Sequence, residues 1–168
     1  YVMSQLPEHI DIEAHPFLDN PLVVMAPKNH PLTKEKNIPL KRLVEEPFIM
    51  RESGSGTRKA IQDLFDGHDL ELKVRLELGS NEAIKQAIAG GLGISVLSCH
   101  TLTPEGSTGQ LTILDVDEFP IKRQWYVVHL GSKQLSVVAS TFLEYLKAEA
   151  NYLADGIIEL QKQLLGHQ

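Results

Sequence analysis

The sequence has 168 residues, of which 42% are hydrophobic and 23% are charged, a composition typical of a globular protein with one sizeable core or two small ones. Its formal net charge of −6 argues against a free-standing nucleic-acid binder, which usually carries a basic face. No stretch approaches the roughly 20 apolar residues of a membrane span. Cys99 is the single cysteine, so no internal disulfide can form, and a reducing cytoplasmic location is expected.

Hydrophobic periodicity predicts strands that alternate with helices. Strands are expected, in chain order, over 11–18, 21–27, 47–50, 71–78, 94–98, 110–116 and 123–130. The first of them carries an irregularity at Pro16, and the fourth has the most regular alternation. Helices are expected over 39–44, from the turn at 53–57 to Gly67, from Ser80 to Gly90, and from Leu135 onward with a break near Asp155-Gly156. This order predicts an α/β fold with a mainly parallel sheet.

The turn between the strand at 47–50 and the following helix is the sharpest candidate site. Its glycines let the backbone turn tightly and approach a ligand, and Ser53 or Ser55 can cap the helix. The N-terminus of a helix favours an anion, and Thr57 adds a hydroxyl between the arginines at 51 and 58. We interpret the stretch as an anion-binding turn without a catalytic role, and an ordinary helix cap that binds nothing is the alternative.

Sharper motifs are absent from the turn. A P-loop requires a lysine and then Ser or Thr after its last glycine, but Gly56 is followed by Thr57-Arg58. A dinucleotide fingerprint requires a third glycine, and a nucleophile elbow requires Gly-x-Ser-x-Gly; neither pattern occurs here. We find no positive case for an enzyme and expect no cofactor.

A second helix N-terminus follows Ser80. In an open α/β sheet both helix N-termini would project from the carboxyl ends of their strands, where ligands bind. Converging N-termini would suit a small carboxylate or phosphate ester, so Asn81 joins the candidate effector-binding residues. Ser80 and Asn81 are equally ordinary capping residues.

The seven histidines show no metal-binding pattern. None pairs with another at helical i,i+4 spacing and none forms a metal-ligand pattern with a cysteine, so no metal site is expected. His129 lies on a predicted strand and is expected to pack in the core, with a position facing a cleft as the alternative.

Four stretches together resemble a known family. They are Glu52–Arg58, Glu77–Lys85, Ala89–Ile94 and Trp125–His129, and they are similar to the effector-binding domain of LysR-type transcriptional regulators. The resemblance runs from Tyr1 to Glu149 and is nearest to the branch that controls carbon-fixation genes, the CbbR, RbcR and CmpR regulators.

This resemblance implies two Rossmann-like subdomains of the periplasmic-binding-protein type II kind. Residues 27–122 would form subdomain II, residues 1–26 and 123–150 a partial subdomain I, and residues 151–168 a C-terminal helical tail. The family's opening strand-helix unit and its winged helix-turn-helix have no counterpart in this sequence, so subdomain I is expected to be truncated at its N-terminus.

The resemblance also implies a function. A small anionic metabolite, such as a sugar phosphate, phosphoglycolate or 2-oxoglutarate, would bind between the subdomains. Its expected contacts are Ser53, Gly54, Ser55, Gly56 and Thr57 from subdomain II and Ser4 from subdomain I. Binding would shift the population of subdomain arrangements in a cytoplasmic dimer or tetramer that meets DNA through the N-terminal domain, and would control RuBisCO, CO2-fixation or inorganic-carbon genes. The alternatives are a solute-binding protein of a transport system and a module that only dimerises.

Overall fold

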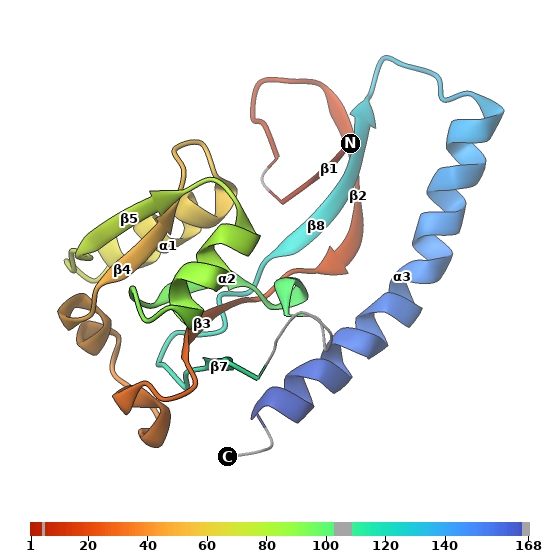
Figure 1. Ribbon diagram of the computed structural model, residues 1–168. Helices are drawn as coiled ribbons and strands as arrows, with labels where there is room; N and C mark the ends of the chain where they lie inside the picture. Colours follow the sequence, from red (N-terminus) through yellow and green to blue (C-terminus); the bar gives the residue numbers. More distant parts are fainter. Residues whose placement is uncertain (5, 103–108, 166–168) are drawn as a thin grey trace. The chain divides into compact units, whose positions relative to one another are not determined.

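The computed structural model describes residues 1–4, 6–102 and 109–165; for residue 151 and residues 153–165 it describes only the course of the helix. The chain forms two compact units, of which unit 1 comprises Tyr1–Asn20 and Lys122–Gln168 and unit 2 comprises Pro21–Ile121 (Figure 1). Residues 21–26, which were expected in the first subdomain, lie in unit 2, because they pair with strands of that unit.

Unit 2 is built on a mixed sheet. β3 (Leu22–Pro27) pairs antiparallel with β6 (Ser95–Ser98) and β7 (Leu111–Ile113), and β4 (Phe48–Arg51) pairs parallel with β5 (Val74–Leu78). A parallel bridge between Phe48 and Ile94 joins the two groups of strands. The expectation of a mainly parallel sheet is therefore wrong. Among the described strands of unit 2, only the β4–β5 pair has the expected parallel direction, whereas both partners of β3 run antiparallel to it.

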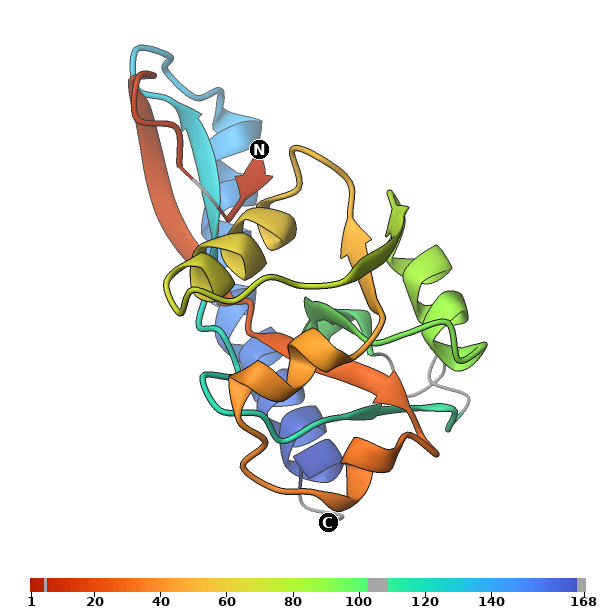
Figure 2. The ribbon, with the colours of Figure 1, turned by 90° about the vertical axis from the view of Figure 1, so that its left-hand side faces the viewer.

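Helices pack against this sheet and complete the core of unit 2. Ile61 and Phe65 of α1 are buried, as are Ile84 and Ile88 of α2. In Figure 2 the helical turns η1 and η2 follow β3 along the chain, and Leu40 and Leu43 of η2 belong to the same hydrophobic cluster as Leu22 and Val24. The helical elements of unit 2 are α1 (Gly56–Asp66), α2 (Asn81–Ala89), η1 (Pro31–Lys34), η2 (Leu40–Glu45) and η3 (Cys99–Thr101).

Two predicted elements of unit 2 differ in detail. The short helix expected over 39–44 is a 3₁₀ helix. The strand expected over 71–78 begins only at Val74, and that valine is 48% exposed. Among the described residues β5 pairs with β4 alone, so it is an edge strand, and regular alternation in its sequence did not guarantee a covered face.

Unit 1 contains a three-stranded antiparallel sheet in the order β1-β8-β2. Its strands are β1 (Val2–Met3), β2 (Ile12–Asp19) and β8 (Gln124–Leu130). The register of β2 shifts between Pro16 and Leu18, which confirms the irregularity predicted at the proline. Proline lacks the N–H that a regular ladder needs.

The last element of unit 1 is α3 (Val137–Leu165), which packs on β2. The expected break near Asp155-Gly156 does not occur. A glycine inside a helix costs only about 1 kcal/mol, which a helix of 29 residues can absorb. None of the helices that the structure describes combines the length and apolarity needed to cross a membrane.

Candidate functional site

The turn between β4 and α1 has the geometry that the sequence predicted. The apolar residues of β4 are buried, and Arg51 is the first partly exposed residue at its carboxyl end. Ser55 caps α1, since its Oγ accepts a hydrogen bond from the Arg58 N–H at 3.5 Å. Gly54 adopts φ +86°, a left-handed conformation that favours glycine. Ser55 therefore has the capping role that had been left open between it and Ser53.

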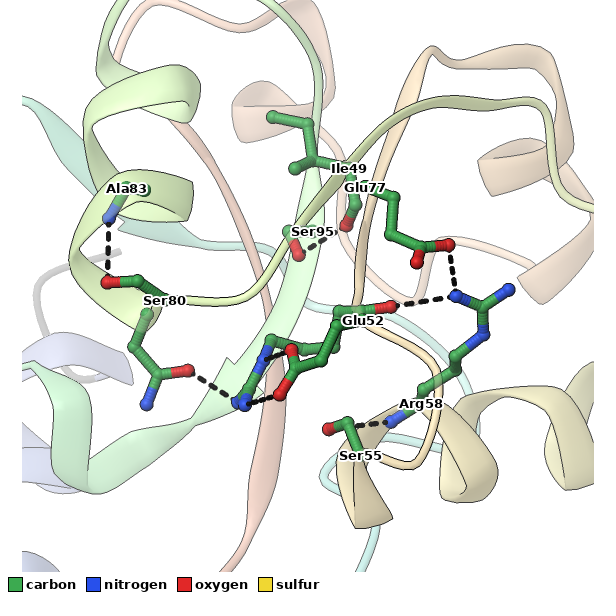
Figure 3. A network of polar contacts seen from close by, with 10 residues as sticks. Ile49, Glu52, Ser55, Arg58, Glu77, Ser80, Ala83 and Ser95 are labelled. Atoms are coloured by element: carbon green, nitrogen blue, oxygen red, sulfur yellow. Dashed lines mark hydrogen bonds and ion pairs between the residues drawn. The ribbon is translucent and has the colours of Figure 1, made fainter.

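Arg51 links this turn to the start of α2. Its Nε and Nη2 donate to the two carboxylate oxygens of Glu52 at 2.7 and 2.8 Å, a bidentate pair. Its Nη1 donates to Oδ1 of Asn81 at 2.8 Å. Figure 3 shows this network beside the capped end of α1. The structure thus links Asn81 to Arg51 at the start of the turn, although 30 residues separate them in the sequence.

Arg58 links the same turn to β5. Its Nη1 donates to the main-chain oxygen of Arg51 at 3.0 Å and to the carboxylate of Glu77 (Figure 3). The hydrogen bond from Arg58 lowers the pKa of Glu77, and the hydrogen bond from Arg51 lowers the pKa of Glu52. Both carboxylates are ionised at neutral pH, so two positive and two negative charges surround the turn.

The main-chain N–H groups of the turn divide into those with acceptors and those without. Two have acceptors: Ser55 donates to the main-chain oxygen of Glu52, and Arg58 donates to Oγ of Ser55. Within the described residues the N–H groups of Gly56 and Thr57 have no acceptor, as expected in the first turn of a helix. The Thr57 hydroxyl, which is partly buried, is likewise without a partner there. An anion at this helix end would meet three donors.

The N-terminus of α2 is capped in the same way. Oγ of Ser80 accepts from the Ala83 N–H at 3.4 Å, which confirms the predicted cap. Asn81 is the first helical residue, and its side-chain oxygen is already occupied by Arg51. The side-chain nitrogen of Asn81 remains able to donate to a ligand.

Ser4 belongs to unit 1 and follows β1. Its Oγ lies 2.6 Å from Nη2 of Arg123, which also approaches the main-chain oxygen of Ser4 at 3.4 Å. Burial lowers the pKa of Arg123, but a guanidinium stays charged at neutral pH. Sequence reasoning did not single out Arg123, and the one available signal was its position at the start of a predicted strand.

Three further side chains meet on the sheet of unit 1. In the β2–β8 ladder Glu13 lies directly opposite His129, and His15 lies two residues along the same strand. Nε2 of His15 and Nε2 of His129 are 3.4 Å apart. Local sequence patterns do not indicate this cluster, because 114 residues separate the two histidines.

Comparisons with known proteins bear on these features. The family model for the LysR substrate binding domain matches residues 1–151. The HTH-type transcriptional activator CmpR of Synechocystis is 55% identical over 148 residues, which are 88% of this chain and 49% of that protein. The RuBisCO operon transcriptional regulator of Acidithiobacillus ferrooxidans is 51% identical over 156 residues, or 93% and 50% of the two chains. The chain therefore spans about half the length of these curated relatives.

Solved structures show the same relationship. The Synechocystis PCC6803 CcmR regulatory domain, in complex with 2-PG, is 63% identical and superposes with a TM-score of 0.86, covering 89% of this chain and 72% of that one. The effector binding domain of QuiR, in complex with shikimate, is 22% identical with a TM-score of 0.78, covering 90% and 71%. The second similarity concerns the fold alone.

Proposed function

Because the chain belongs to the LysR substrate binding domain family, we propose that it is the effector-sensing domain of a transcriptional regulator of carbon-fixation genes. Its effector is a small anion with a phosphate or two carboxylates, and 2-phosphoglycolate is the first candidate. The similarity to CmpR and to the RuBisCO operon regulator supports the regulatory role. The 2-PG complex of the CcmR regulatory domain supports the effector.

The observation that carries this proposal is the open N-terminus of α1. The N–H groups of Gly56 and Thr57 and the Thr57 hydroxyl supply three donors for one anionic group. The positive end of the helix dipole adds to them. Ser53 and Gly54 shape the turn that presents these donors, and Ser55 supports the helix end on which they lie.

An anion at the turn would compete with two carboxylates for the neighbouring arginines. Glu52 holds Arg51 through two hydrogen bonds, and Glu77 holds Arg58. An anion that recruited Arg51 would have to replace Glu52 as its partner. The amide nitrogen of Asn81 then serves as a further donor on the same unit.

In unit 1, Ser4 and the neighbouring Arg123 offer a hydroxyl and a guanidinium as further candidate contacts for an anion. An effector that binds one conformation of the protein more tightly than another shifts the population toward that conformation. In the full-length regulator this shift would be transmitted through a dimer or tetramer to the DNA-binding domains. Couplings of this kind typically amount to about 1–3 kcal/mol.

The test is calorimetric titration of the chain with 2-phosphoglycolate. Thr57→Val removes one hydroxyl at nearly constant volume. Loss of one hydrogen bond to a charged group, about 1.5 kcal/mol, would weaken binding roughly tenfold. Thr112→Val in β7 is the matched control, since it makes the same change at a partly buried position away from the turn. We expect the control to bind as the unchanged chain does.

Two outcomes would contradict the proposal. Equal affinity in Thr57→Val and Thr112→Val would mean that the α1 terminus is only a helix cap. No binding of 2-phosphoglycolate, sugar phosphates or 2-oxoglutarate, by this chain or by the full-length regulator, would remove the assignment of an anionic effector.

A further inference from the structure

The side chains of Glu13, His15 and His129 converge on one point of the unit 1 sheet. The three potential ligand atoms all lie within 4.8 Å of one another. Nε2 of His129 is 3.4 Å from Nε2 of His15 and 3.4 Å from Oε2 of Glu13, and Nε2 of His15 is 4.0 Å from that same oxygen. The antiparallel pairing of β2 with β8 produces this arrangement, because it places Glu13 opposite His129.

These separations are close to those of a metal coordination sphere. Zinc bound tetrahedrally at about 2.0–2.1 Å from nitrogen and oxygen ligands holds adjacent ligand atoms roughly 3.3–3.4 Å apart. Two of the three distances match this edge length, and the third, 4.0 Å, would have to shorten by roughly 0.6 Å. The Glu13 side chain is 58% exposed and is free to make that shift.

The hydrogen bonding of His129 prepares it to coordinate. Its Nδ1 lies 3.2 Å from the main-chain oxygen of Leu130, which can only accept, so Nδ1 carries the proton. Nε2 of the neutral ring is then left with a lone pair directed at the other two residues. Metal-binding histidines are typically oriented in this way by a hydrogen bond from their second nitrogen.

A pocket of about 400 Å³ lies in front of the three side chains. It leaves room for a water molecule in the fourth coordination position. The charged groups that line it are Glu13, Lys133, Glu144 and Lys147, so the lining is neutral overall apart from the histidines. Lys147 is paired with Glu144 at 3.1 Å, which reduces its repulsion of a cation.

From this geometry we propose that Glu13, His15 and His129 form a binding site for one Zn²⁺ ion. Two imidazoles and one carboxylate suit zinc, and they do not suit calcium, which requires six to eight oxygen ligands. The bound ion would connect β2 to β8, two strands from opposite ends of the chain. Without the ion, the same three groups form a hydrogen-bonded cluster in which the imidazole rings stack at 5.5 Å.

The experiment is calorimetric titration of the metal-free chain with Zn²⁺, repeated with Ca²⁺. We expect one equivalent of Zn²⁺ to bind and Ca²⁺ to give no signal. Loss of a residue that only hydrogen-bonds to a metal ligand weakens metal binding by about tenfold or more. Glu13→Gln and His129→Gln each remove a direct bond to the metal, so each should weaken binding by at least about tenfold. His68→Gln, at an exposed histidine in the turn after α1, is the matched control and should bind normally.

A second measurement separates loss of a ligand from loss of the fold. Substitution by Co²⁺ should produce the visible absorption of a tetrahedral site in the unchanged chain and in His68→Gln. This absorption should be lost in Glu13→Gln. The Glu13 side chain is exposed, so it can be replaced without unfolding the sheet. Circular dichroism checks the fold of each variant. The proposal is overturned by a chain that binds no Zn²⁺ at one equivalent, or by unchanged Zn²⁺ affinity in folded Glu13→Gln and His129→Gln.

Discussion

Gly93→Ala tests the close approach that aligns β4 with β6. Gly93 has φ +156°, and a Cβ atom at this position would lie 2.4 Å from the main-chain oxygen of Pro47 and 3.0 Å from its carbon. Because real Cβ contacts essentially never fall below 3.0 Å, the backbones would have to separate by about 0.6 Å, the difference between these two values. The same oxygen accepts the Ile94 N–H at 2.9 Å, so the movement weakens a hydrogen bond between the strands.

The expected cost follows from three contributions. Overpacking costs about 1–3 kcal/mol, the left-handed backbone about 1–2 kcal/mol, and the weakened hydrogen bond up to about 1 kcal/mol. We therefore expect Gly93→Ala to lower the free energy of unfolding by about 4 kcal/mol, a large share of the 5–15 kcal/mol typical of a domain. Urea unfolding followed by far-ultraviolet circular dichroism measures this loss.

Gly54→Ala is the matched control. Gly54 also has a positive φ, +86°, but a Cβ atom there would meet no other atom within 4 Å. Only the cost of the backbone conformation applies, about 1–2 kcal/mol. If the two variants lost equal stability, steric contact with Pro47 would not be what requires glycine at position 93.

Two further predictions concern the turn itself. Ser55→Ala should lower the free energy of unfolding by about 1 kcal/mol, because it removes the cap of α1. Ser53 is exposed and has no side-chain hydrogen bond among the described residues, so Ser53→Ala should lower the free energy of unfolding little. Urea unfolding measures both losses, and equal losses would refute the capping role of Ser55. Arg58 lowers the pKa of Glu77, so their interaction stabilises the fold above the ordinary glutamate pKa of 4.5 and is lost as pH falls through the lower pKa of the folded state. Thermal unfolding between pH 6 and about 3 should therefore show a shallower acid loss in Glu77→Gln than in the unchanged chain, with Glu71→Gln as the control; identical slopes in Glu77→Gln and the unchanged chain would contradict this.

Local patterns predicted most elements of this fold, because their causes are local. Apolar runs marked β3 and β4, and a serine before a helical stripe marked the start of α1. Strand direction depends on which segments become neighbours, and this information is not in the local pattern. The mainly parallel sheet was therefore the part of the prediction that was wrong.

The candidate site likewise has a part that local sequence could predict and a part that it could not. The Ser53–Thr57 turn could be found because its residues are contiguous. The partners of its arginines could not, since Asn81 lies 30 residues from Arg51 and Glu77 lies 19 residues from Arg58. The pairing of His15 with His129 depends on strand register across most of the chain, so no spacing rule could have indicated it.

The division of the chain between the two units also affects the order in which the chain folds. Unit 2 is one continuous segment, whereas the sheet of unit 1 requires β2 to meet β8 from the far side of that segment. Closing so long a loop costs entropy before any contact repays it. Folding of unit 2 pairs Leu22 with Ile121 and so brings the two segments of unit 1 together. We expect unit 2 to fold first and the sheet of unit 1 to form after it.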